Sequence, residues 1–450
     1  MGEIDFNEKG EGRRIKAATL LTLIYGGVFL LHLSSWGIRV IQAGIALMVV
    51  HFLRLFLARS HPGHSSEREY QDYQPKVSLL VAAKNEEQVI ANLVAGLCQL
   101  EYDPELWELW VIDDNSSDRT PEILEQLKHK YPQLKTLNRD ADSFGGKSGA
   151  LNQVLPLTMG EIIGVFDADA QVSKDSLQKV IPLFAKPRLG AVQLRKEIAN
   201  ANFNFWTRGQ SIEMALDIWF QDRRAKVGGV GELRGNGQFV RRSALFSCGG
   251  WNEQTITDDL DLTLRLHLDR WDVRCLFHPA VAEEGVVGWW QLWHQRNRWA
   301  EGGYQRYLDY WSLIVRNRVG VVKSFDLLIF MIIQYILPTA VVPDLLAAYI
   351  LQQPPILMPL FSTSFAMFTM VMIMGNRQSY QLPWYRLLWH TILGSIYMTH
   401  WLFVVASVTH RMSIRPKRLK WVKTIHQGIS DSLAFEDYDE IDGLGSQSSK

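Results

Sequence analysis

The stretch that decides the fold is Ile162-Ile163-Gly164-Val165-Phe166-Asp167-Ala168-Asp169, an apolar run that ends on two acids one residue apart. Continuous hydrophobic residues of this length are typical of a parallel strand that is buried on both faces. Open α/β sheets bind ligands in the crevice outside the carboxyl ends of such strands. The sequence therefore predicts that Asp167 and Asp169 lie at a ligand-binding edge of a sheet.

Two carboxylates at this spacing suit a metal ion. In an extended segment residues i and i+2 point to the same side, so Asp167 and Asp169 can converge on one hard divalent cation. Mg²⁺, or alternatively Mn²⁺, would keep its other positions for water or diphosphate oxygens. The alternative is a pair of solvated acids that ends a strand, and an isolated D-x-D pattern does not decide between the two.

The composition sets broad limits. The chain has 450 residues, which suits two or three domains. Its formal net charge is +0, so no overall field points to nucleic acid, and we expect no nucleic-acid partner. Cys98, Cys248 and Cys275 have neither metal-type nor redox-type spacing and are expected to be reduced thiols. Nothing in the composition fixes an oligomeric state.

Apolar segments at both ends of the chain predict membrane helices. Residues 17–33 and 38–58 are each near the roughly 20 residues that a helix needs to cross a bilayer. Basic residues flank this pair on its outer sides, which places both ends and the following domain in the cytoplasm. Apolar character returns over 325–351, 355–375 and 385–408. Three spans would leave the C-terminus outside, whereas the basic residues after 410 favour a cytoplasmic tail, so a fourth segment stays open.

Two further strands between the membrane segments also end on polar residues. Residues 77–83 lead into Glu86, and residues 107–112 end on Asp113 and Asp114. Strands followed by helices predict a doubly wound, mostly parallel sheet. Acids at these strand ends are well placed to bind the base or ribose of a nucleotide. The alternative is the ordinary role of Asp and Asn in turns.

Three other motifs carry candidate functional groups. Lys147 follows two glycines at the start of a helix and is a candidate diphosphate contact, although the spacing of an NTP-hydrolysing phosphate loop is absent. Thr257-Asp258-Asp259 enters an amphipathic helix, where acids can also act only as caps. Gln295, Arg298 and Trp299 fall on one face of a later helix.

The order of these motifs resembles the family 2 glycosyltransferases of GT-A fold, above all their membrane-bound branch, which includes cellulose, chitin and hyaluronan synthases. The matching set runs from about residue 77 to 310, with one departure, because the usual T-E-D is Thr257-Asp258-Asp259 here. The resemblance implies an inverting transfer with Asp259 as base. It implies donor and nucleotide contacts at Glu86, Asp113, Asp114, Lys147 and Asp167, metal contacts at Asp167 and Asp169, and acceptor or pocket contacts at Asn236, Asp258, Gln295, Arg298 and Trp299.

Three longer phrases, 233–242, 257–262 and 294–307, resemble the β-monoglucosyldiacylglycerol synthases of photosynthetic bacteria. That resemblance implies UDP-glucose as donor, the 3-hydroxyl of 1,2-diacylglycerol as acceptor, Mg²⁺ as cofactor and a lipid bilayer as surroundings. A processive polysaccharide synthase shares Gln295, Arg298 and Trp299 and is the alternative enzyme. A transporter that only binds a nucleotide sugar is the non-enzymatic alternative, suggested by Asp344 within an apolar segment.

The predicted organisation is an α/β, GT-A domain flanked by transmembrane α-helices in a bacterial membrane. Its segments are a cytoplasmic N-terminus at 1–16, two membrane helices at 17–58, a linker at 59–75, the cytoplasmic catalytic domain at 76–312, three or four membrane segments at 313–410, and a cytoplasmic tail at 411–450 that is basic, then acidic and partly disordered.

Overall fold

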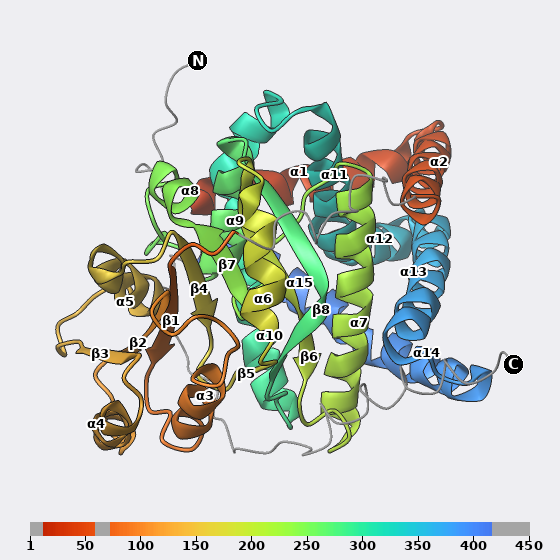
Figure 1. Cartoon of the computed structure of the whole chain (residues 1–450). Helices are drawn as coiled ribbons and strands as arrows, with labels where there is room; N and C mark the ends of the chain where they lie inside the picture. The colour runs from red at the N-terminus through yellow and green to blue at the C-terminus, as the bar shows by residue number, and fades with distance from the viewer. Residues whose placement is uncertain (1–11, 59–72, 416–450) are drawn as a thin grey trace, which may run out of the picture.

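The computed structural model describes residues 12–58 and 73–415. The predicted linker at 59–75 and the predicted tail at 411–450 therefore lie mostly outside the described residues. Within them the chain forms one mixed sheet, the helices that cover it, and a set of long apolar helices (Figure 1).

The described residues form an eight-stranded sheet in the order β3-β2-β1-β4-β7-β6-β8-β5. The first four neighbours are parallel, whereas β7 runs antiparallel to β4 and to β6. The strands are β1 Val77–Ala83, β2 Trp107–Asp113, β3 Leu134–Asn138, β4 Ile162–Phe166, β5 Gln171–Val172, β6 Leu189–Ile198, β7 Gln238–Arg241 and β8 Asp272–Glu283. The predicted buried strand is therefore β4, at the centre of the sheet between β1 and β7.

Helices cover the sheet because its strands are apolar on both faces. Leu79 and Val81 of β1 pack into one core cluster, and Leu80 between them packs into the other. Such two-sided burial is what a parallel strand requires. The helices of this region are α3 Ile90–Leu97, α4 Thr120–Lys130, α5 Gly146–Val154, α6 Ser176–Val180, α7 Phe205–Lys226, α8 Arg242–Ser247, α9 Asp258–Leu268 and α10 Trp289–Val315.

Five helical segments among the described residues are long and apolar enough to cross a membrane. They are α1 Arg13–Leu33, α2 Gly37–Phe56, the continuous segment Val321–Leu351, α13 Met358–Tyr380 and the continuous segment Trp384–Ile414. The third contains α11 Val321–Met331, a π-helical turn at Ile332–Ile336 and α12 Leu337–Leu351, and the fifth contains α14 Trp384–Met398 and α15 His400–Ile414.

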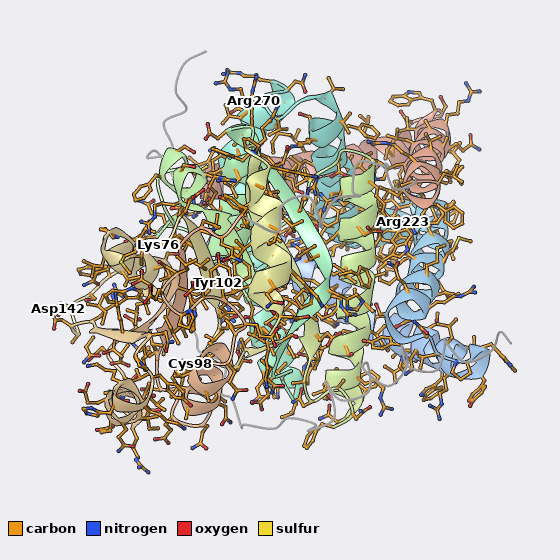
Figure 2. The ribbon with its side chains drawn as sticks, in the orientation of Figure 1. Lys76, Cys98, Tyr102, Asp142, Arg223 and Arg270 are labelled. Atoms are coloured by element: carbon orange, nitrogen blue, oxygen red, sulfur yellow. The ribbon has the colours of Figure 1, made fainter. Side chains whose placement is uncertain are left out.

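The apolar helices pack directly against the sheet domain. Helix α7 lies alongside α13 at the right of Figure 1 and also contacts α14. At its end, Arg223 donates to the carbonyl oxygen of Ala58 over 2.8 Å, which ties α7 to the segment after α2; Figure 2 labels this arginine beside α13.

Asp344 has local partners that account for its place in an apolar helix. Its Oδ1 lies 2.8 Å from Nε2 of His32 and accepts from the amide of Ile356 over 3.0 Å. Its Oδ2 accepts from the amide of Leu357 over 3.2 Å. Because a buried carboxylate is stable only when it is hydrogen-bonded, these contacts give Asp344 a structural role at the turn before α13.

Candidate active site

The end of β2 holds the first pair of predicted site residues. Asp113 is buried, with 4% of its surface exposed, and its Oδ1 has no hydrogen-bond partner among the described residues. Asp114 pairs with Arg139, which also donates to the carbonyl oxygens of Phe144 and Gly146. Arg139 therefore joins the acidic end of β2 to the glycine-rich loop. Oδ1 of Asp113 remains able to accept a hydrogen bond.

The glycine-rich loop brings a lysine to the end of β4. Gly145 has φ +86°, and a Cβ there would lie 2.5 Å from Oε2 of Glu253, so glycine is required at this turn. Helix α5 starts directly afterwards, and Nζ of Lys147 donates to Oδ1 of Asp167 over 2.5 Å. Burial lowers the pKa of Lys147, but the carboxylates of Asp167 and Asp258 outweigh it and raise that pKa above its usual value.

A third acid joins Asp167 and Asp169. Burial, Glu283 and Asp167 together raise the pKa of Asp169 to about 8, which means that negative charge is crowded here. The amide of Glu284 donates to Oδ2 of Asp169 over 2.8 Å, and Nζ of Lys196 lies 2.7 Å from Oε2 of Glu283. The strand ends of β4 and β8 therefore face each other across one acidic pocket.

The donor set fits a metal that shares its ligands with a diphosphate. Among the described residues no group of three or more His, Cys, Asp or Glu side chains has the geometry to hold an ion by itself. Asp167 and Asp169 supply two hard oxygen ligands, and burial together with the neighbouring carboxylates of Glu283 and Asp167 raises the pKa of Asp169. Mg²⁺ is usually bound by one or two carboxylates together with substrate phosphates, so the residues present suit it.

Asp258 and Asp259 open helix α9 opposite this pocket. Oδ2 of Asp258 is buried without a partner in the described part of the chain, and Oδ1 of Asp259 accepts from the amide of Leu260 over 2.8 Å. Burial and the neighbouring charge of Asp258 raise the pKa of Asp259 to about 6. A carboxylate with such a pKa is ionised at neutral pH and still basic enough to accept a proton.

Helix α10 places the last motif beside these acids. Gln295, Arg298 and Trp299 all line the same cavity as Asp167 and Asp259. Burial lowers the pKa of Arg298, while Asp167 and Asp259 act in the opposite direction, which indicates that its guanidinium faces both acids.

Arg296, between them in sequence, points the other way. Its guanidinium lies 3.9 Å from the ring centroid of Trp299. The same group donates to Oε2 of Glu213 on α7 over 2.6 Å and to the hydroxyl of Tyr397 on α14 over 3.2 Å. Trp401 of α15 donates to Oε1 of Glu213 over 2.8 Å.

Of two further predicted residues, Asn236 lies outside the cavity lining and Glu86 lies in it. Asn236 has no exposed surface, and its side chain accepts from the amide of Asp167 over 3.2 Å and donates to Glu283 over 3.3 Å. Asn236 therefore contacts Asp167 and Glu283 directly and links the ends of β4 and β8. Glu86 is buried and lines the cavity, and its amide donates to Oγ1 of Thr120 over 2.8 Å.

One continuous cavity of about 640 Å³ connects this polar site to the apolar helices. Its polar end is lined by Asp114, Lys147, Asp167, Asp169, Asp258 and Asp259. Its apolar end is lined by Phe52, Phe220, Ile333, Phe365, Phe368 and Leu402. A belt of buried charge also lines the cavity, in which Glu232 contacts Arg224, Arg234 and Arg306.

The structure adds cavity residues that the sequence analysis did not single out. They include Lys84, Lys196, Glu213, Glu232, Arg234, Glu283 and Glu284. Glu283-Glu284 ends a strand with two acids, the same signal that identified Asp113-Asp114, and was therefore detectable. Glu232 carried no signal that distinguishes it from a surface charge, whereas Arg234 lies within the phrase 233–242 that resembles the family.

Comparison with known proteins identifies the family. Residues 78–247 match the family Glycosyl transferase family 2. The chain is 57% identical to a β-monoglucosyldiacylglycerol synthase from Trichormus variabilis, over 95% of this chain and 92% of that protein. It is 53% identical to a β-monoglucosyldiacylglycerol synthase from a Synechocystis species, over 94% and 90% of the two chains.

A solved structure shows the same fold at low identity. The mannosyltransferase PcManGT from Pyrobaculum calidifontis, determined with GDP-Man and Mn²⁺, gives a TM-score of 0.53 at 19% identity and covers 88% of this chain and 98% of its own. The predicted fold class and the predicted family are thereby confirmed, while the roles of the individual site residues stay predictions. The chain belongs to the β-monoglucosyldiacylglycerol synthases, a group of glycosyltransferases within family 2.

Proposed function

We propose that this enzyme transfers glucose from UDP-glucose to the 3-hydroxyl of 1,2-diacylglycerol and so forms β-monoglucosyldiacylglycerol. The observation that carries the proposal is the cavity that joins an acidic, nucleotide-type site to a space lined by apolar helices. UDP-glucose is water-soluble and diacylglycerol is not, so the enzyme needs one cavity that can bind both a polar donor and an apolar acceptor. The names of its relatives supply the sugar and the product.

The donor is proposed to bind across the ends of β1, β2 and β4. Asp113 has a buried, unpartnered oxygen that suits an N–H donor of the base. Lys147 offers a charged ammonium group to the diphosphate. When Mg²⁺ is bound by Asp167 and Asp169, it offsets the charge that develops on the departing diphosphate. Mn²⁺ is the alternative ion.

Asp259 is proposed as the base for a single in-line displacement. It takes the proton from the acceptor hydroxyl while that oxygen attacks the anomeric carbon, and the UDP oxygen leaves from the opposite side. One displacement converts an α-linked donor into a β-linked product. Arg298 faces Asp167 and Asp259 and is proposed to hold the donor phosphates close to the attacked carbon, and Gln295 and Trp299 to shape the pocket around the sugar.

The membrane arrangement follows the basic residues. We propose that residues 76–312 form the catalytic domain on the cytoplasmic side, where UDP-sugars are made, and that the apolar helices at 17–58 and 313–410 seat it in the bilayer. In this arrangement the apolar end of the cavity opens among the helices, and diacylglycerol enters sideways from the membrane.

A product assay tests the proposal. The purified full-length protein would receive radiolabelled UDP-glucose, Mg²⁺ and diacylglycerol, and products would be separated by thin-layer chromatography. We expect a labelled glycolipid that D259N reduces by about 10²–10⁴-fold, the usual contribution of a general base. The matched control is D142N, whose exposed side chain lies at the outer edge of the sheet domain (Figure 2).

The other outcomes are informative. Label only in immobile polymer would replace the proposal with a processive synthase. Transfer from a different UDP-sugar alone would keep the mechanism and overturn the donor. Full activity in D259N would remove the assigned base.

A further inference from the structure

A second cavity of about 870 Å³ lies between α1, α10 and α15. In the described part of the chain it shares no lining residue with the catalytic cavity. Its walls come from the first turns of α1, from Glu301 and Gln305 of α10, and from the last turn of α15. Both α1 and α15 belong to segments apolar enough to cross a membrane, so the cavity lies where such helices end.

Positive charge is in excess in this cavity. Four arginines line it, and two of them are neutralised, because Arg13 pairs with Asp309 and Arg411 pairs with Glu301. The side chains of Arg14 and Arg415 are exposed and make no ion pair or hydrogen bond with any described residue. Within the described residues, two positive charges of this cavity are therefore not balanced by an acid.

The first turn of α1 adds to this preference for an anion. No side chain caps it, and it contains no acidic residue. Within the described residues its first amide groups therefore have no side-chain acceptor, and the positive end of the helix dipole lies in the turn that lines the cavity.

The remaining wall is mixed, with apolar residues beside Thr19, Thr22, Gln305 and Ser413, and its apolar part suits more than a simple ion. Ile15 and Leu23 are 73% and 65% exposed, and Ala18 and Met412 line the same side. The cavity thus combines arginines with apolar residues of α1. This combination suits an amphiphile with an anionic head and an acyl chain. Anionic lipids are attracted by basic residues at the cytoplasmic membrane surface.

We propose that this cavity binds the headgroup of an anionic, phosphate-bearing lipid and that the bound lipid stabilises the catalytic loop. The link runs through two side chains. Arg13 donates to the carbonyl oxygen of Gln254 over 2.8 Å, and Oε1 of Gln305 accepts from the amide of Ile256 over 3.2 Å. Residues 254–257 lead directly into Asp258 and Asp259 at the start of α9. An occupant that orders Arg13 and Gln305 therefore orders the segment that carries the proposed base.

Direct binding is the first measurement, because it does not depend on any transfer reaction. Delipidated full-length protein in detergent would be incubated with phosphatidylglycerol or with phosphatidylcholine, and retained lipid would be counted by native mass spectrometry. We expect phosphatidylglycerol to be retained preferentially, and R14Q/R415Q to bind it about thirtyfold more weakly, given the attraction per basic residue near a membrane surface.

A matched pair controls for loss of charge. R39Q/R386Q also removes two exposed arginines, from outside this cavity, and should retain phosphatidylglycerol like the unmodified protein. Equal retention of both lipids, equal loss in the two double variants, or displacement by millimolar inorganic phosphate would overturn the lipid site. The last result would identify free phosphate as the ligand.

The coupling to catalysis has its own test. The protein would be placed in nanodiscs of phosphatidylcholine with and without phosphatidylglycerol, and donor turnover measured at saturating diacylglycerol. We expect several-fold stimulation by phosphatidylglycerol, which R14Q/R415Q loses and R39Q/R386Q keeps. Stimulation that persists in R14Q/R415Q, or its absence in a protein shown to bind the lipid, would overturn the coupling.

Discussion

Nζ of Lys147 and Oδ1 of Asp167 lie 2.5 Å apart, so the lysine is hydrogen-bonded to one of the two carboxylates that are proposed to hold the metal. Asp167 and Asp258 keep that lysine charged, since they raise its pKa against the effect of burial. Donor phosphates would draw the lysine away and leave Asp167 to the metal. The ion and the nucleotide are therefore expected to bind cooperatively.

The first prediction concerns this cooperativity. Mn²⁺ binding, followed by electron paramagnetic resonance, should strengthen about tenfold or more when UDP is added, because a coupling of 1–3 kcal/mol is typical between linked sites. In K147M, Mn²⁺ should bind more tightly without UDP, and the KM for UDP-glucose should rise. The control is K128M, which removes a half-buried lysine of α4 that pairs only with Glu125 in the described residues. Equal Mn²⁺ affinity with and without UDP in the unmodified enzyme would contradict this prediction.

The second prediction is a pH dependence. Burial and the charge of Asp258 raise the pKa of Asp259 to about 6. A base works only when ionised, so kcat/KM should be constant above that pH and fall as the pH drops through about 6. D258N removes the neighbouring negative charge, which should lower the pKa of Asp259 and move the acid limb to lower pH. An acid limb that stays in place or moves upward would contradict the assignment, and D142N should leave it unchanged.

The third prediction concerns the apolar end of the cavity. Ser364 lines it from α13, and Ser362 on the same helix is exposed and does not. S364F should fill space that an acyl chain needs and raise the KM for long-chain diacylglycerol about tenfold or more, with little effect on UDP binding. S362F adds the same group outside the cavity and should behave like the unmodified enzyme. Equal KM values for the two variants would show that the acceptor binds elsewhere.

The fourth prediction concerns the buried charge belt. Glu232 has no exposed surface and contacts three arginines, which hold its pKa well below the usual range against the effect of burial. E232Q removes the charge that these arginines share and should cost about 3–5 kcal/mol of stability, as removal of one partner of a buried pair does.

A fluorogenic maleimide gives the readout for this stability change. Cys248 is buried, and burial raises the pKa of the Cys98 thiol to about 11 and of the Cys275 thiol to about 12, so the folded protein reacts slowly. The labelling transition of E232Q should shift down by several degrees. E105Q, an exposed site, should not shift it. A transition for E232Q that overlaps the unmodified protein would show that the arginines have other partners.

Local sequence patterns predicted the strands and their acidic ends because these signals are short-range. The apolar run at 162–166 is β4, and 77–83 is β1 with the expected bounds. Long-range pairings carried no such signal. The contact between Asn236 and Asp167 joins residues 69 positions apart, and Glu232 forms an ion pair with Arg306 of the distant helix α10. The continuous cavity also depends on how α7 packs against α13, which no local pattern encodes.

Arg296 connects helix α10 to the C-terminal helices through Glu213. It follows Gln295 directly and stacks on Trp299, yet its charge is balanced by Glu213, which Tyr397 and Trp401 hold from the C-terminal helices. A chain cut after α10 would leave that pair without two of its hydrogen-bonding partners and would loosen the motif from behind. We therefore expect residues 76–312 expressed without the C-terminal helices to be less stable than the same residues in the full-length protein. Exchange of the C-terminal helices between relatives should give a stable protein only when the new helices also supply the hydrogen-bonding partners of Glu213.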